Sequence, residues 1–178
     1  MDIELTPGKE FERTVARLRK APTEIKRQLS KEIKDATAPI EKAAKQNVLD
    51  IASKGARGGG GAARGEHLAA RSKRGKAGAT GLRKSISRGV TRKITYSGYR
   101  TGVRVRVDGK YMPESQRPLI KATNKGEVRH PVFGNRNNWT NQQFIPKGWF
   151  DRATQQHGRV AIRKIQEAAR KALQRLGD

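Results

Sequence analysis

The stretch TEIKRQLSKEIKDATAPIEKAAKQNVLDI, residues 23–51, decides the fold because it carries one continuous apolar stripe. The apolar side chains recur every three or four positions, which is the spacing of one face of an α-helix. They are Ile25, Leu29, Ile33, Ala36, Ile40, Ala44, Val48 and Ile51. A helix over this segment would be roughly 43 Å long at 1.5 Å per residue. That is long for a small core, so the stripe is expected to pack either on the chain's own sheet or partly on another subunit.

Prolines divide this N-terminal region into parts. Phe11, Val15 and Leu18 form a shorter stripe before Pro22, and they predict a separate first helix. Pro22 suits the beginning of the second helix, where a missing N–H costs nothing. Pro39 lies inside the second helix, removes one backbone hydrogen bond and is expected to bend it.

Residues 54–80 differ sharply in composition from the helical region before them. Glycine is frequent in this segment, which has many basic residues and a single acidic residue, Glu66. Such a composition buries too little apolar surface to order itself, so we predict a flexible basic, glycine-rich insert. The run Gly58–Gly61 is not a phosphate-binding loop, because no GK[ST] ending follows it. Six residues are candidate contacts for a polyanion or a partner protein: Arg57, Arg64, Arg71, Lys73, Arg74 and Lys76.

The middle of the chain predicts a short helix followed by a β-hairpin. Leu82, Ile86 and Val90 are four positions apart, as on a short amphipathic helix. The segments ITYSG (94–98) and GVRVRVDG (102–109) then predict two strands joined by a turn. In the second strand, valines alternate with Arg104 and Arg106. This arginine face is expected to be exposed, and contact with an acidic surface is the alternative.

The last third of the chain predicts a long loop and a final helix. Residues 109–147 are rich in Asn, Gly and Pro, and only Ser115 to Ala122 are expected to contain a short helical stretch. An apolar stripe from Trp149 to Leu176 predicts the final helix, which Gly158 weakens. The fold class is therefore α+β: a long N-terminal helix, a short helix, an antiparallel hairpin or small sheet, a long loop, and a C-terminal helix packed on the sheet. We expect a single domain over residues 1–178.

Aromatic residues concentrate in the segment 129–150. Because aromatic side chains bury large areas, we expect this segment to anchor the final helix to the hairpin sheet. The candidate structural anchors are Phe133, Trp139, Phe144, Trp149 and Phe150. His130 is expected to pack or to form a hydrogen bond there, without a catalytic role.

The charge balance points to an anionic partner. The chain has 40 Lys and Arg residues against 16 Asp and Glu residues, a formal net charge of +24. A charge of this size opposes a compact isolated monomer and favours a polyanion or an acidic protein surface as partner. No apolar run approaches the length of a membrane span, so no membrane partner is expected.

The residue types that carry catalysis are scarce or scattered. The chain has no cysteine, which excludes disulfides, thiolate zinc sites and cysteine nucleophiles. His67, His130 and His157 lack metal-ligand spacing, and the acids in the middle of the chain are isolated. We therefore expect no catalytic residue, no metal site, no cofactor and no enzymatic activity.

Three segments resemble the neck or tail-completion family of siphophages, small proteins that join phage heads to tails. The first is the helix running from Leu18 through Ala21-Pro22, Glu24-Ile25 and Leu29 to Ala38-Pro39-Ile40 and Ala43-Ala44-Lys45. The second, TGLRKSI at 80–86, is similar to the family's G-x-L-x-x-S-I element, which precedes a hairpin. The third is RHPVFGN at 129–135 with the later Trp139, Gln143, Pro146 and GWF at 148–150, and it resembles versions from phages of actinobacteria.

The resemblance covers nearly the whole chain in order, apart from the basic insert. It implies a virion protein of the neck region, assembled in the host cytoplasm, without catalysis or cofactor. It also implies a homo-oligomeric ring, expected to be a hexamer or a dodecamer, between the capsid portal complex and the tail tube. Expected partners are neighbouring connector, tail-terminator or tail-tube proteins, and DNA in the channel. The alternative from the residues themselves is a basic nucleic-acid-binding protein, either ribosome-associated or DNA-compacting.

Overall fold

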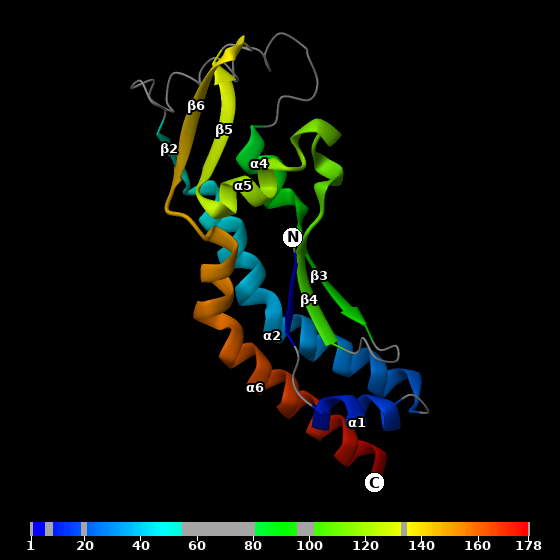
Figure 1. Ribbon diagram of the computed structural model, residues 1–178. Coiled ribbons are helices and arrows are strands. Elements are labelled where there is room, and N and C mark those ends of the chain that lie inside the picture. Colours follow the sequence, from blue (N-terminus) through cyan, green and yellow to red (C-terminus); the bar gives the residue numbers. More distant parts are fainter. Residues whose placement is uncertain are drawn as a thin grey trace. The chain divides into compact units, whose positions relative to one another are not determined.

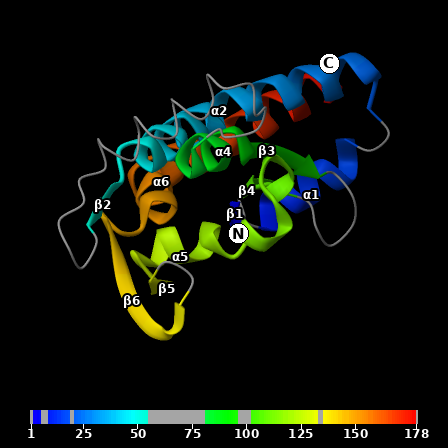
Figure 2. The same ribbon diagram turned by 90° about the horizontal axis from the view of Figure 1, so that it is seen from above.

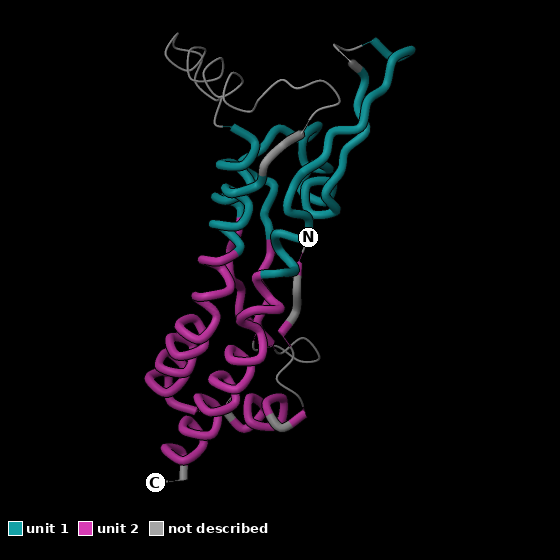
Figure 3. The backbone as a smooth tube through the Cα atoms, turned by 90° about the vertical axis from the view of Figure 1, so that its left-hand side faces the viewer, with its two compact units in different colours: residues 1, 44–89, 107–152 teal, residues 2–43, 90–106, 153–178 magenta. Residues whose placement is uncertain are grey.

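The computed structural model describes residues 2–5, 9–18, 21–54, 81–95, 102–132 and 135–177. The chain divides into two compact units, coloured in Figure 3. Unit 1 comprises residues 1, 44–89 and 107–152, and unit 2 comprises residues 2–43, 90–106 and 153–178. Two of the boundaries fall inside long helices, α2 (Thr23–Leu49) and α6 (Trp149–Gly177). Helices and antiparallel sheets confirm the α+β class, whereas the single domain stays a prediction.

Unit 2 is built on a small antiparallel sheet. The strands β3 (Val90–Thr95) and β4 (Gly102–Val107) are neighbours in it, as the predicted hairpin requires, and the connecting residues 96–101 lie outside the described residues. A third strand, β1 (Asp2–Leu5), pairs antiparallel with β4, so that Ile3 lies opposite Val105. The strand β1 was not predicted, because four residues are too few to establish a period of two.

Three helices cover the core of unit 2. The first helix is α1 (Lys9–Leu18), and it ends before Pro22, as predicted. Within this unit α2 and α6 lie side by side and antiparallel (Figures 1 and 2). The core contains residues of all three helices together with Val103 of β4. The helix and linker residues in it are Phe11, Val15, Ala21, Leu29, Ile33, Ala36, Ile165, Ala168, Ala169 and Ala172. The prediction that the C-terminal helix packs on the sheet is therefore confirmed.

The apolar stripe of α2 is buried by the chain itself. The seven stripe residues from Leu29 to Ile51 are at most 7% exposed, and Ile25 packs against the core cluster. The structure therefore favours the first of the two expected partners, the chain's own core. The stripe offers little free apolar surface to another subunit.

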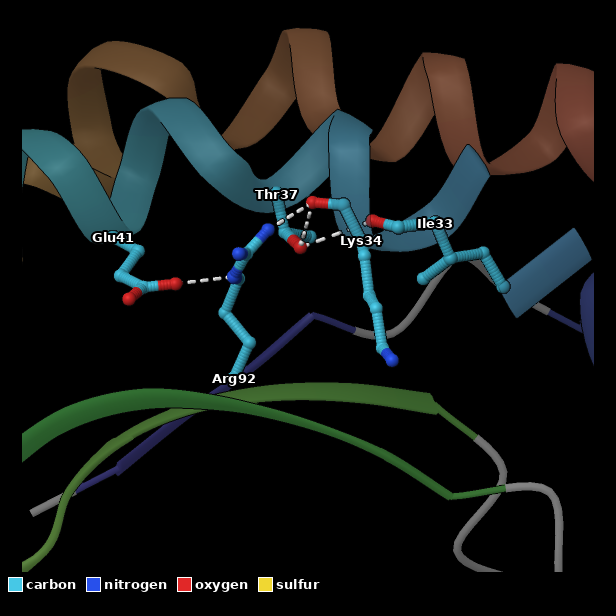
Figure 4. Close-up of polar contacts among 5 residues, drawn as sticks. All are labelled: Ile33, Lys34, Thr37, Glu41 and Arg92. Atoms are coloured by element: carbon cyan, nitrogen blue, oxygen red, sulfur yellow. Dashed lines mark hydrogen bonds and ion pairs between the residues drawn. The ribbon is translucent and has the colours of Figure 1, made fainter. Parts of the chain in front are cut away.

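A polar contact connects β3 to α2 inside unit 2 (Figure 4). The guanidinium of Arg92 donates a hydrogen bond to the backbone carbonyl of Lys34 and forms an ion pair with Glu41. Thr37, which is fully buried, donates its hydroxyl to the carbonyls of Ile33 and Lys34 at 3.0 and 3.2 Å. The side chains of Arg92 and Glu41 are 26% and 16% exposed, so the ion pair is largely screened from water.

Replacing Arg92 with methionine is expected to lower the free energy of unfolding by about 1–2 kcal/mol. The substitution keeps an apolar stem but leaves Glu41 without its guanidinium and the Lys34 carbonyl without this donor. Urea unfolding followed by circular dichroism measures the change. Lys93→Met is the matched control, because Lys93 is the next residue of β3 and is exposed. Equal losses for the two variants would contradict the role of the contact.

Unit 1 contains a second antiparallel sheet and several short helices. Its sheet has the order β2–β6–β5, formed by β2 (Ala52–Lys54), β6 (Asn135–Ile145) and β5 (Glu127–Val132). The predicted short helix is present as α4 (Leu82–Gly89). The remaining elements are two 3-10 turns, η2 (Gly109–Tyr111) and η3 (Glu114–Gln116), and the helix α5 (Leu119–Lys125).

The short helical stretch expected at Ser115 to Ala122 overlaps α5, but the prediction that the rest of residues 109–147 is irregular is wrong, since they hold the β5–β6 hairpin. The segment NRNNWTNQQFI of β6 lacks the apolar alternation by which strands are recognised. Main-chain pairing on both sides of β6 supplies its stability instead: residues 143–145 pair with β2, and residues 135–143 pair with β5. A pattern of side chains could not reveal this pairing.

The start of α6 is held in place by α5. The side-chain oxygen of Asn124 accepts the backbone N–H of Phe150 at 2.9 Å, as an N-cap residue would. The amide nitrogen of the same side chain donates to the carboxylate of Asp151 at 2.8 Å. The backbone carbonyl of Asn124 accepts the N–H of Gly148 at 2.7 Å. The Nδ2 of Asn47, on α2, donates to the carbonyl of Trp149 at 3.0 Å. Within unit 1, side chains of α5 and α2 therefore hold the start of α6 in place. The sequence had instead predicted that the segment 129–150 anchors this helix.

Candidate polyanion-binding site

The β5–β6 hairpin of unit 1 has one half-buried face and one exposed face. Val128, His130, Thr140 and Gln142 are half-buried, and Phe144 on the same face is buried. The alternate positions form the exposed face. These are Glu127, Arg129, Trp139, Asn141 and Gln143, and cross-strand pairs place Arg129 opposite Asn141 and Glu127 opposite Gln143. The strand period of two therefore gathers polar and basic side chains on one surface.

Helix α5 supplies two lysines beside this surface. Lys121 and Lys125 are four residues apart, so they project from the same face of the helix, and both are exposed. Gly126, with φ of 94°, ends the helix in the left-handed conformation and donates its N–H to the Ala122 carbonyl at 3.0 Å. The chain thereby turns directly from α5 into β5. This tight turn places the lysine face of α5 next to the exposed face of the hairpin.

An open groove of about 520 Å³ lies between α5 and the hairpin. Its lining has three cationic side chains, one carboxylate, one amide and two apolar residues: Lys121, Lys125, Arg129, Glu127, Asn141, Pro118 and Ala122. Neither lysine forms an ion pair with another residue in the described part of the chain. The groove therefore carries an excess of positive charge and donors suited to an anion.

An exposed tryptophan contacts Arg129, one of the residues that line the groove. Trp139 is 47% exposed, and the guanidinium carbon of Arg129 lies 5.4 Å from the centre of its ring. The indole nitrogen donates to the backbone carbonyl of Arg136 at 2.6 Å, which fixes the orientation of the ring. Because the indole N–H is used within the hairpin, the ring offers mainly an apolar surface to a ligand.

No family model, curated protein or solved structure matches this chain.

The structure separates the two groups of residues singled out from the sequence. The six candidate polyanion contacts lie outside the described residues, and so does Phe133 among the aromatic anchors. Phe144, Trp149 and Phe150 are buried in unit 1, as expected of anchors. Trp149 and Phe150 pack edge to face with ring centres 5.5 Å apart. The hairpin sheet of β3 and β4 to which they were expected to hold α6 belongs mainly to unit 2, whereas these aromatics belong to unit 1.

The assignment of Trp139 as a structural anchor is wrong. Its position places it on the exposed face of the hairpin, where its neighbours are Arg129 and the backbone of Arg136. Aromatic content alone indicated burial, but strand alternation decides the side to which a residue points. The segment had been taken as a loop, so no alternation was available to place Trp139.

The residues that line the groove were not predicted from the sequence. One signal could have found part of the site: Lys121 and Lys125 are at i and i+4, the first inside the expected helical stretch 115–122 and the second just after it. Arg129 and Asn141 are twelve positions apart, and only the register of the hairpin brings them together. The sequence instead pointed to the insert, because basic residues are denser there than in the segment 118–141.

His130 and the acidic residues are the remaining side chains that could serve catalysis or bind a metal ion. The Nδ1 of His130 lies 3.1 Å from the carbonyl oxygen of the adjacent Pro131, which agrees with the expected hydrogen bond. Within the described residues, His, Asp and Glu side chains do not gather in groups of three that could hold a metal ion.

Among the helices that the structure describes, none combines the length and the apolar character needed to cross a bilayer.

Proposed function

We propose that this protein is a structural component of the head–tail connector of a long-tailed bacteriophage, a neck or tail-completion protein that forms a ring between the capsid portal complex and the tail tube. The observation that carries the proposal is where the three family-like motifs lie in the fold. The first runs from Leu18 at the end of α1 into α2, the second begins α4 directly before β3, and the third supplies residues of β5 and β6 and the start of α6. Each motif therefore corresponds to a defined element, in the order that the resemblance requires.

The hairpin supports an assembly role. Residues 135–139 of β6 are exposed, including the large side chain of Trp139, and they pair only with β5 among the described strands. In Figures 1 and 2 the hairpin extends away from α4 and α5 of the same unit. A two-stranded extension of this kind contributes little to its own core and suits contact with a neighbouring protein.

The test is an averaged cryo-electron microscopy image of the neck of intact virions. We expect this chain as a closed ring on the axis between head and tail, since closed symmetry is the usual solution for homo-oligomers. Particles produced with a stop codon at Lys9 are the control, and they should appear as unjoined heads and tails. A chain found at one copy, or away from the axis, would contradict the proposal. Absence from the particle together with association with ribosomes or the nucleoid would favour the nucleic-acid-binding alternative.

A further inference from the structure

We infer that the groove between α5 and the β5–β6 hairpin is a binding site for a single strand of nucleic acid, with phosphates at Lys121, Lys125 and Arg129 and a base stacked on Trp139. This inference does not depend on the connector proposal, because it concerns a surface of the isolated protein. It also involves none of the basic residues of the insert 54–80.

The cations line both sides of the groove, so one strand lying in it can contact all three. Lys121 and Lys125 are separated by one turn of α5, so their ammonium groups can contact different phosphates of the same strand. Arg129 lies across the groove on β5, and its guanidinium can form paired hydrogen bonds with phosphate oxygens. Asn141, opposite Arg129, adds an amide donor. Backbone contacts of this kind provide affinity without reading the sequence.

Trp139 distinguishes a nucleic acid from a simple acidic ligand. Proteins that bind single strands combine a basic groove with aromatic rings on which bases stack. Here the ring is held by Arg129 and by the hydrogen bond to the Arg136 carbonyl, so it loses little freedom when a base packs on it. An acidic peptide would use the cations but would gain nothing specific from an exposed indole. The combination therefore favours a nucleic acid strand over an acidic protein.

Glu127 gives the site an internal test. Its carboxylate lines the same groove and repels phosphate, so Glu127→Gln should strengthen binding. Removing one like charge close to a phosphate should raise the affinity by about threefold near 0.15 M salt, because repulsion between exposed charges is modest and partly screened. A residue with a purely structural role would not produce a gain.

The experiment measures binding of the full-length protein to a fluorescein-labelled oligothymidylate by anisotropy. A length of about 12 nucleotides lies within the usual site size for such grooves. We expect the triple variant Lys121→Gln, Lys125→Gln, Arg129→Gln to lower the affinity on the order of 50-fold near 0.15 M salt. The slope of log affinity against log salt should fall by about 2, because three phosphate contacts are lost at ~0.7 each.

A charge-matched control is necessary because the whole chain carries +24. Lys31→Gln, Lys42→Gln, Arg159→Gln removes three exposed cations from helices α2 and α6 of unit 2. None of the three lines the groove, so this control changes only the diffuse, salt-screened attraction and should lose less than about fivefold. Thermal unfolding followed by circular dichroism identifies any variant that fails to fold. If the triple variant fails to fold, the expected gain in affinity of Glu127→Gln still tests the groove.

Tryptophan fluorescence tests the stacking directly. A base stacked on Trp139 should quench its emission. The chain's other tryptophan, Trp149, is fully buried, so the quenching reports on Trp139 alone. Trp139→Leu should remove the quenching and lower the affinity about tenfold, the typical effect of losing one base-stacking aromatic ring.

Three results would overturn the inference. The first is an equal loss of affinity in the groove variant and the charge-matched control, which would mean diffuse attraction. The second is an unquenched Trp139 at saturating oligonucleotide. The third is polyglutamate binding that matches oligothymidylate in affinity and is equally insensitive to Trp139→Leu, which would assign the groove to acidic proteins.

Discussion

Replacing Trp149 with alanine is expected to lower the free energy of unfolding by about 3–5 kcal/mol, the usual cost of truncating a fully buried tryptophan. The side chain is 0% exposed and packs edge to face on Phe150. Its indole nitrogen points at the hydroxyl of Thr123, 3.4 Å away, and Thr123 donates to the carbonyl of Ile120 at 3.0 Å. The truncation would therefore leave a cavity between α5 and the beginning of α6, inside unit 1.

Chemical denaturation with urea measures this loss, and the chain offers a matched control. Trp139→Ala removes the same side chain from an exposed position and should cost less than about 1 kcal/mol, because it loses mainly the contact with Arg129 and an exposed hydrogen bond to the Arg136 carbonyl. A different result would change the assignment of Trp149. If Trp149→Ala kept its stability but failed to join heads to tails, the aromatic cluster would be a docking surface and not a core.

The second large effect is expected at Gly89, the last residue of α4. A Cβ atom at this position would lie well inside van der Waals distance of the backbone carbonyl oxygen of Asp108. The two residues are also joined by a hydrogen bond of 2.8 Å from the Asp108 N–H to the Gly89 carbonyl. Asp108 in turn caps η2 by accepting the N–H of Lys110 at 3.0 Å. Gly89→Ala should therefore push α4 away from η2 and cost about 3 kcal/mol, the upper part of the range for overpacking.

Gly158→Ala is the control for this prediction. Gly158 is also buried and helical, but a Cβ there would meet Thr154 at 3.4 Å and Leu5 at 3.9 Å, which are ordinary contacts. Alanine has the higher helix propensity, so this variant should be neutral or more stable by up to about 1 kcal/mol. Similar melting temperatures for the two variants would show that backbone contact does not set the requirement at Gly89.

Local patterns were sufficient for the helices and for β3 and β4. The repeat of apolar residues in 23–51 identifies α2 and its buried face, because helical periodicity persists over seven turns. Pro22 marks the boundary with α1, since proline suits the start of a helix. The alternation of Val103, Val105 and Val107 with two arginines identifies β4 and its buried side, and all three valines are buried. These segments bury one face, and burial is what makes a sequence periodic.

The β5–β6 hairpin and the groove depend on tertiary structure. The side chains of β6 are mostly polar and exposed, so the strand leaves no periodic signal, and its main-chain bonds are independent of side-chain identity. The register of that pairing brings Arg129 beside Asn141 and Trp139, and the turn at Gly126 brings the lysines of α5 to the same groove. The sequence by itself determined the fold class, the buried faces of the long helices and the strong positive charge. Only tertiary structure decided which few cations converge and which tryptophan is exposed, because convergence arises from pairing between segments that share no local pattern.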